Sequence, residues 1–257
     1  ITSRVSWQWL PDSRVMDSAN AINLFGLTAA NQAADAPLPA TFDRWAAHHQ
    51  LGFRSLQDKH QLSAIVHASY DWLCKTPNLL GRRLHYQSQI PESIAQAQQL
   101  LHMDTRSANW MHAWQPLMPT DDPTLGKEQR ERMALEKEAA CFLASRTLHN
   151  LRELMPRITC PDDTLAILLA AWRSAEIYSQ MFSHVAAAVT DVLWLDHYGA
   201  NSLPADTLQK HQQRLLDYTD TLDRWLADPP ASGPLFLPLL LSPDRLERFA
   251  RSLSESL

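Results

Sequence analysis

Glycine is scarce in this chain, with six residues among 257. Strand-rich folds need glycine at many tight turns, whereas helices are weakened by it. The sixteen prolines lie mostly between segments of helical periodicity, where proline can begin or end a helix. The composition therefore argues against a strand-rich fold and favours helices.

Other features are also lacking. The three cysteines are too widely spaced for a disulfide framework or a C-x-x-C zinc pattern, so we expect reduced thiols in a cytoplasmic protein. No run approaches the roughly eighteen uninterrupted apolar residues of a membrane span. The net charge of −5 argues against extensive binding to nucleic acid or anionic membrane. The sequence begins at Ile1 rather than at methionine, so we expect upstream residues, whose targeting signals would lie outside it.

Hydrophobic periodicity predicts an all-α fold, a multi-helix bundle built on two long helices. Asp122 and Pro123 are a typical cap and first turn, and nothing breaks the pattern before Pro156. A second long helix is predicted from 163 to 198, because Gly199 suits the position after a helix. The short connection 156–162 must reverse the chain, so helices 123–155 and 163–198 should form an antiparallel hairpin.

Shorter helices complete the predicted bundle. We expect one from about 55 to 76, one from about 202 to 227, and one from 243 onward. In the second of these, Leu208, Leu215 and Leu222 repeat at seven-residue steps and should lie on the buried face. The proline-containing stretch 115–122 is the strongest candidate boundary. It separates an N-terminal helical region with an irregular arm, 1–115, from a C-terminal bundle, 116–257, and we expect the two to form one continuous globular unit.

A line of polar residues follows the predicted helix 163–198. At 100° per residue these side chains fall within about a 100° stripe on an otherwise apolar surface: Arg173, Glu176, Gln180, Ser183, His184, Asp191 and Tyr198. Surface patterning predicts that the stripe faces water, and we expect exposure for Arg173 and Gln180. In the alternative interpretation the stripe lines a pocket, and Glu176 and His184 are the catalytic or ligand-binding residues.

The charge-rich segment 127–138, KEQRERMALEKE, reads as a solvated face of the first long helix. Motifs of easily recognised enzymes are absent: E-x-x-H, H-E-x-x-H, G-x-S-x-G, a P-loop and a Rossmann glycine fingerprint. We therefore predict no metal site and no cofactor. His48 and His49 beside Trp45 form a weak pattern, for which ordinary structural positions are the expectation.

Trp7 and Trp9 lie in an irregular N-terminal segment with little to bury them. Exposed aromatic residues at a terminus are typical anchors for a partner chain. The leading hypothesis is a non-enzymatic helical subunit or adaptor of a larger protein assembly, with Trp7 and Trp9 as partner-binding residues; a homo-oligomer is compatible with it. The alternatives are a helical-bundle enzyme or small-ligand or metal-binding protein with a pocket along the central helix, and a nucleic-acid-associated factor using Arg82–Arg83.

Overall fold

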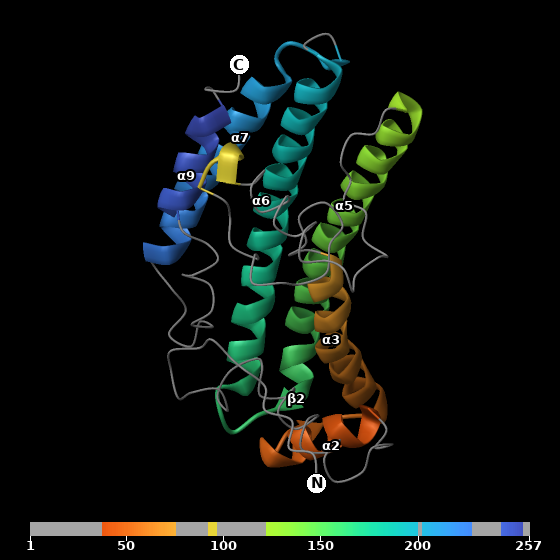
Figure 1. Cartoon of the computed structure of the whole chain (residues 1–257). Helices are drawn as coiled ribbons and strands as arrows, with labels where there is room; N and C mark the ends of the chain where they lie inside the picture. The colour runs from red at the N-terminus through yellow and green to blue at the C-terminus, as the bar shows by residue number, and fades with distance from the viewer. Residues whose placement is uncertain (1–37, 76–91, 97–121, 200–201, 228–242, 254–257) are drawn as a thin grey trace, which may run out of the picture. The chain divides into compact units, whose positions relative to one another are not determined.

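The computed structural model describes residues 38–75, 92–96, 122–199, 202–227 and 243–253 (Figure 1). Most of these residues are helical, as the sequence predicts. The elements in chain order are α2 (Leu38–His48), β1 (Gly52–Phe53), α3 (Leu56–Lys75), α5 (Pro123–Leu154), the 3-10 turn η3 (Met155–Arg157), β2 (Ile158–Thr159), α6 (Thr164–Tyr198), α7 (Thr207–Ala227) and α9 (Pro243–Ser252). The all-α prediction is confirmed, since β1 and β2 form the only sheet within these ranges.

Both predicted long helices are present. α5 ends at Leu154, and Pro156 lies in the 3-10 turn that follows, because proline cannot donate the hydrogen bond that would continue the α-helix. α6 runs without a break for 35 residues. Gly199 follows it with φ of 86°, a left-handed conformation that glycine adopts without strain. Within the described ranges, no helix carries a stretch both long and apolar enough to cross a membrane.

The chain divides into two compact units, each assembled from separate stretches of sequence. Unit 1 comprises residues 1–69, 145–174 and 229–237, and unit 2 comprises 70–144, 175–228 and 238–257. α3, α5 and α6 each contribute a segment to both units. The boundary predicted near residue 115 lies outside the described residues.

The core of unit 1 gathers apolar side chains from α2, α3, the end of α5, β2 and the start of α6. They include Phe42, Trp45, Leu62, Ile65, Leu151, Leu154, Ile158 and Leu168, all buried. β1 pairs with β2 in antiparallel register, with Gly52 opposite Thr159 and Phe53 opposite Ile158. A Cβ atom on Gly52 would lie 2.2 Å from Oγ1 of Thr159, so a larger residue here would displace the Thr159 hydroxyl.

The core of unit 2 lies among α6, α7, α9 and the first part of α5. Its buried apolar residues include Met133, Ala140, Phe182, Val185, Val189, Leu208, Leu215, Leu246 and Phe249. α7 and α9 pack side by side (Figure 1). Leu215 is fully buried, as its spacing predicts.

Contacts between α5 and α6 in unit 2 follow a regular order. Gly126 lies against the ring of Trp194, Arg130 bonds to Asp191, and the Lys137 ammonium lies over the Phe182 ring. Residue numbers rise along α5 as they fall along α6, as an antiparallel arrangement requires. A hairpin over the full length of both helices stays a prediction.

Candidate functional site

The polar stripe of α6 changes its environment along the helix. Arg173 is exposed, as expected. Gln180 was also expected to be exposed but is only partly so, as are Glu176 and His184. Asp191 is buried, with a side chain 4% exposed. Neither interpretation of the stripe, facing water or lining a pocket, therefore describes all of it.

Asp191 is the most strongly held member of the stripe. Its Oδ1 accepts a hydrogen bond from Nε of Arg130 at 2.6 Å, and its Oδ2 lies 2.9 Å from Nε2 of His211. The Arg130 guanidinium also lies 5.9 Å from the centre of the Trp194 ring. A buried carboxylate is costly unless it is paired and hydrogen-bonded, and here a guanidinium from α5 and an imidazole from α7 supply both. The arrangement fastens three helices of unit 2 to one another.

His184 lies about two turns before Asp191 on α6. The centre of its ring lies 5.4 Å from that of Tyr218 on α7. Burial, together with the positive charges of Arg214 and His211, lowers the pKa of His184 from its usual 6.5 to about 4. The imidazole is therefore uncharged at pH 7. At that pH it has no imidazolium proton to donate.

The structure does not bring Glu176 and His184 into one catalytic pair. Eight residues separate them, which is about 12 Å along a helix axis. Within the part of the chain that the structure describes, no group of three or more His, Cys, Asp or Glu side chains could hold a metal ion. Both residues remain candidates by sequence pattern alone. Trp7 and Trp9 lie outside the described residues.

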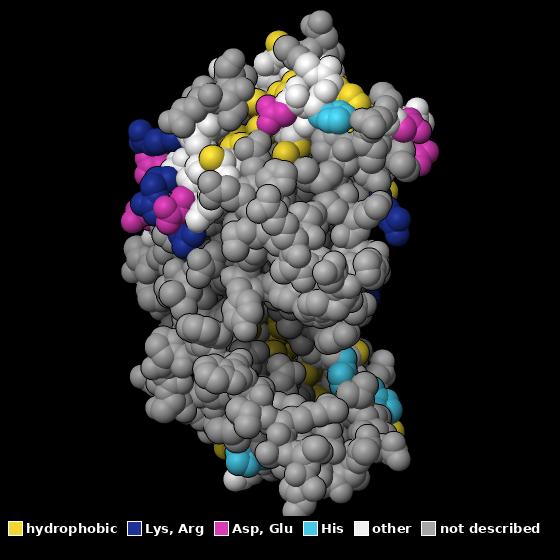
Figure 2. Space-filling model, in the orientation of Figure 1, with side chains coloured by type: hydrophobic (Ala, Val, Ile, Leu, Met, Phe, Trp, Pro, Cys, Tyr) yellow, Lys and Arg dark blue, Asp and Glu magenta, His cyan; other side chains and the backbone are white. Residues whose placement is uncertain are grey.

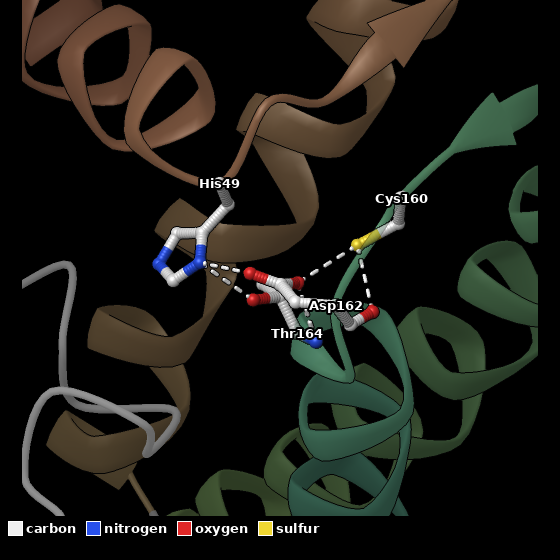
Figure 3. Close-up of polar contacts among 4 residues, drawn as sticks. All are labelled: His49, Cys160, Asp162 and Thr164. Atoms are coloured by element: carbon white, nitrogen blue, oxygen red, sulfur yellow. Dashed lines mark hydrogen bonds and ion pairs between the residues drawn. The ribbon is translucent and has the colours of Figure 1, made fainter.

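A second polar cluster lies in unit 1, where the end of α2 meets the start of α6 (Figure 3). His49 follows the last residue of α2, and the next residue, Gln50, turns the chain with φ of 51° into β1. On the other side, Cys160 follows β2, and Asp162 precedes the first turn of α6. The β1–β2 pair thus places His49 beside Asp162, which is 113 residues away in sequence.

Hydrogen bonds converge on the Asp162 carboxylate. Its Oδ2 lies 2.7 Å from Nδ1 of His49, and its Oδ1 accepts from the backbone N–H of Thr164 at 3.0 Å and from the Cys160 thiol at 3.1 Å. Figure 3 shows Asp162 between His49 and Cys160. Burial raises the pKa of the Asp162 carboxyl, but hydrogen bonds from Thr164, His49 and Cys160 outweigh it and hold that pKa well below its usual range. The carboxylate is therefore ionised at any physiological pH.

The proton of His49 follows from this geometry. A carboxylate only accepts hydrogen bonds, so Nδ1 carries a hydrogen toward Asp162, and the Thr164 hydroxyl oxygen also lies 2.8 Å from Nδ1. Nε2 is buried and has no hydrogen-bond partner among the described residues. The ring packs edge-on against Trp45, with centres 5.4 Å apart.

The cluster resembles a Cys–His–Asp nucleophile only in its residue types. In such a site the imidazole would lie between the carboxylate and the sulfur, whereas here the carboxylate occupies the middle position (Figure 3). Burial, followed by the hydrogen bond to Asp162, raises the pKa of the Cys160 thiol, so the sulfur is protonated at neutral pH. The geometry supports a structural clamp that joins the end of α2 to the start of α6.

Sequence reasoning missed most of these partners. It identified Asp191 but neither Arg130 nor His211, and it dismissed His49 as a weak pattern. The available signals were Asp162 at the start of α6 and the neighbouring histidines, but nothing in the sequence pairs two positions over a hundred residues apart.

Basic side chains on the described surface are interspersed with acidic ones. Figure 2 shows Lys or Arg side chains mixed with Asp or Glu side chains over α9. Nε of Arg245 lies 3.7 Å from Oε1 of Glu92, and NH2 of Arg248 lies 3.5 Å from the same oxygen. Arg251 forms an ion pair with Glu247. These pairings leave α9 without the run of unopposed positive charge that nucleic-acid binding requires. Arg82–Arg83 lies outside the described residues.

The described residues thus form an all-α protein in which two polar clusters join helices that are distant in sequence. Comparison with protein families, characterised proteins and solved structures finds no match to this chain.

Proposed function

We propose that this protein is a non-enzymatic helical subunit or adaptor that binds another protein through the exposed face of α5 in unit 2. The observation that carries the proposal is the exposure of Leu135 and Phe142, each 65% exposed. Seven residues are two turns of an α-helix, so both side chains leave α5 on the same face. Large apolar side chains on one face are typical of a protein-binding surface, because a few such residues supply most of the binding free energy.

The neighbouring charges indicate the chemistry of the partner. Glu128, Glu131 and Glu138 are exposed beside the two apolar side chains, together with Lys127 and Arg132. Nζ of Lys127 lies 3.9 Å from Oε1 of Glu131, so these two charges offset each other and leave two glutamates against one arginine. The face is therefore apolar along its centre and has an acidic excess at its rim. It fits an amphipathic helix whose apolar stripe is flanked by Lys or Arg.

A second copy of this chain fits the face less well. Self-association through the same surface would place the acidic rim of one copy against that of the other, and like charges across an interface are unfavourable. The proposed occupant is thus a different chain with a basic amphipathic helix.

The test uses a synthetic helical peptide with leucines at i, i+3, i+4 and i+7 and lysines on both flanks. Its binding is measured by fluorescence anisotropy against the unaltered protein and against a double variant, Leu135→Asp with Phe142→Asp. The two added carboxylates increase the electrostatic attraction to the peptide, so a loss of affinity isolates the apolar contact. We expect a loss of about thirtyfold, which corresponds to roughly 2 kcal/mol for a central anchor.

Two controls accompany this measurement. Ala134→Asp adds a carboxylate at an exposed position of α5 that lies off the Leu135–Phe142 face, and it should leave affinity unchanged within a factor of about two. A peptide with glutamates in place of lysines should bind at least tenfold more weakly. Equal binding of both peptides, or of the double variant, would refute the proposal. So would concentration-dependent self-association in sedimentation that disappears in the double variant, because the occupant would then be a second copy.

A further inference from the structure

A cavity of about 320 Å³ lies between α3 and α5 in unit 1. Its α3 wall consists of Gln61, Ala64, Ile65 and Ala68, which recur at three- and four-residue steps and therefore share one helix face. The two alanines leave the space that longer side chains would fill. The volume lies at the lower end of the range for small-molecule sites.

Polar groups line the other sides of the cavity. Arg146, Asn150 and Glu153 come from α5, and Arg157 comes from the turn η3. The lining thus combines two guanidinium groups with one carboxylate on the polar side and small apolar residues on α3. Such a combination of an apolar wall with a few convergent donors is typical of a ligand site.

Arg157 is held in place before any ligand arrives. Its NH1 lies 3.2 Å from Oδ1 of Asp58, and its NH2 donates to Oε1 of Gln61 at 3.0 Å. Asp58 is buried, and its carboxylate in turn accepts a hydrogen bond from the Ser55 hydroxyl at 2.8 Å. Each terminal nitrogen of arginine carries two hydrogens, so one N–H on each remains after these bonds. The Arg157 side chain is 41% exposed, which leaves these donors accessible.

We propose that this cavity binds a small carboxylate with a compact apolar body. The carboxylate accepts hydrogen bonds from the remaining N–H groups of Arg157, whose paired donors match its two oxygens, and the Arg146 guanidinium adds positive charge to the lining. The apolar body lies against Ala64 and Ala68. Asp58 balances the charge of Arg157 from outside the lining, so recognition depends on directed hydrogen bonds more than on net charge. The site is separate from the α5 face proposed above, and neither proposal depends on the other.

The test is a titration of ¹⁵N-labelled protein with 4-methylpentanoate, followed by amide NMR shifts. We expect saturable shifts concentrated in 61–68 and 146–157. The neutral isostere 4-methylpentanamide should bind at least about tenfold more weakly, because charged hydrogen bonds contribute more than neutral ones. Arg146→Gln should weaken binding of the carboxylate about tenfold, and Ala64→Phe should abolish it by filling the cavity.

Arg152→Gln is the matched control. Arg152 is also an exposed arginine of α5 but does not line the cavity, so its substitution should leave the affinity unchanged. Thermal unfolding without ligand verifies that each variant is folded, and Ala68→Leu replaces Ala64→Phe if the latter is not. Three results would each overturn the proposal: no saturable shifts, equal affinity for the amide, or equal weakening by Arg152→Gln and Arg146→Gln.

Discussion

Replacing Lys137 by methionine should stabilise the protein. The Lys137 side chain is only 1% exposed, and its Nζ lies 3.2 Å from the Glu136 carboxylate and 5.8 Å from the centre of the Phe182 ring. Burial lowers the pKa of Lys137 from 10.5 to about 8, although Glu136 and Cys141 partly oppose the shift. The folded protein therefore carries a charged ammonium in a place that disfavours the charge.

The size of the effect follows from the shift in pKa. One pKa unit corresponds to about 1.4 kcal/mol, so burying the ammonium of Lys137 costs roughly 3 kcal/mol at neutral pH. Methionine has a similar length and no charge, but it gives up the ion pair with Glu136 and the contact with Phe182. We expect the free energy of unfolding of Lys137→Met to exceed that of the unaltered protein by about 1–3 kcal/mol at pH 7.

The stability gained by Lys137→Met should decrease as pH rises. Below about pH 8 both the folded and unfolded states hold the proton, and the full cost of burial is present. Between about 8 and 10.5 the unfolded chain binds more protons than the folded one, so the unaltered protein gains stability as pH rises. The advantage of Lys137→Met should therefore shrink over this interval, while other groups that titrate there cancel in the difference.

Urea denaturation at pH 7, 9 and 10.5 measures both quantities. Lys127→Met, at an exposed position of the same helix, is the control and should change stability by no more than about 0.5 kcal/mol. A Lys137→Met variant less stable than the unaltered protein at pH 7 would show that the ammonium is well satisfied where it lies. A difference that does not change with pH would equally refute the argument from burial.

Three further results are expected. Asp191→Asn should lower the free energy of unfolding by about 2–4 kcal/mol in urea denaturation, because it leaves Arg130 and His211 without their shared carboxylate; a loss below about 0.5 kcal/mol would mean that the buried pairs contribute nothing net. The depressed pKa of His184 contributes stability that is complete above about pH 6.5 and is lost as pH falls through about 4. An NMR titration of His184 with its midpoint near 6.5 would contradict this. Leu215→Ala should cost about 2–5 kcal/mol, since Leu215 is fully buried, and an unchanged melting temperature would place that face at the surface.

The long helices were predictable because their signals are local. Proline at the start of α5 and glycine after α6 mark helix ends through their backbone geometry alone. Apolar periodicity then indicates that the residues between such limits are helical. The same reasoning predicted the burial of Leu215. The side chain of Leu222, the next leucine of that repeat, is not among those that the structure describes.

The environment of charged residues was not predictable in the same way. Segment 127–138 reads as a solvated charge run, and most of it is exposed, but Lys137 is buried and Arg130 pairs with Asp191. This part of the prediction was wrong because residue type sets only the cost of burial, while the neighbouring helices decide which positions are covered. Long-range pairs such as His49 with Asp162 depend on which helix ends meet, which no local pattern encodes.

The discontinuity of unit 1 has a consequence for how the protein is made. Its β1–β2 pair joins Gly52 to Thr159, and its second segment extends from residue 145 to residue 174. At about 5–20 residues per second, a ribosome needs roughly 5–20 s to make the chain from the end of the first segment to the end of the second, about a hundred residues. During that interval α2 and the first part of α3 present apolar side chains such as Phe42 and Trp45 without the partners that later bury them. The nascent chain is thus exposed to premature association for seconds, because residues 38–69 wait that long for the partners that bury their apolar side chains.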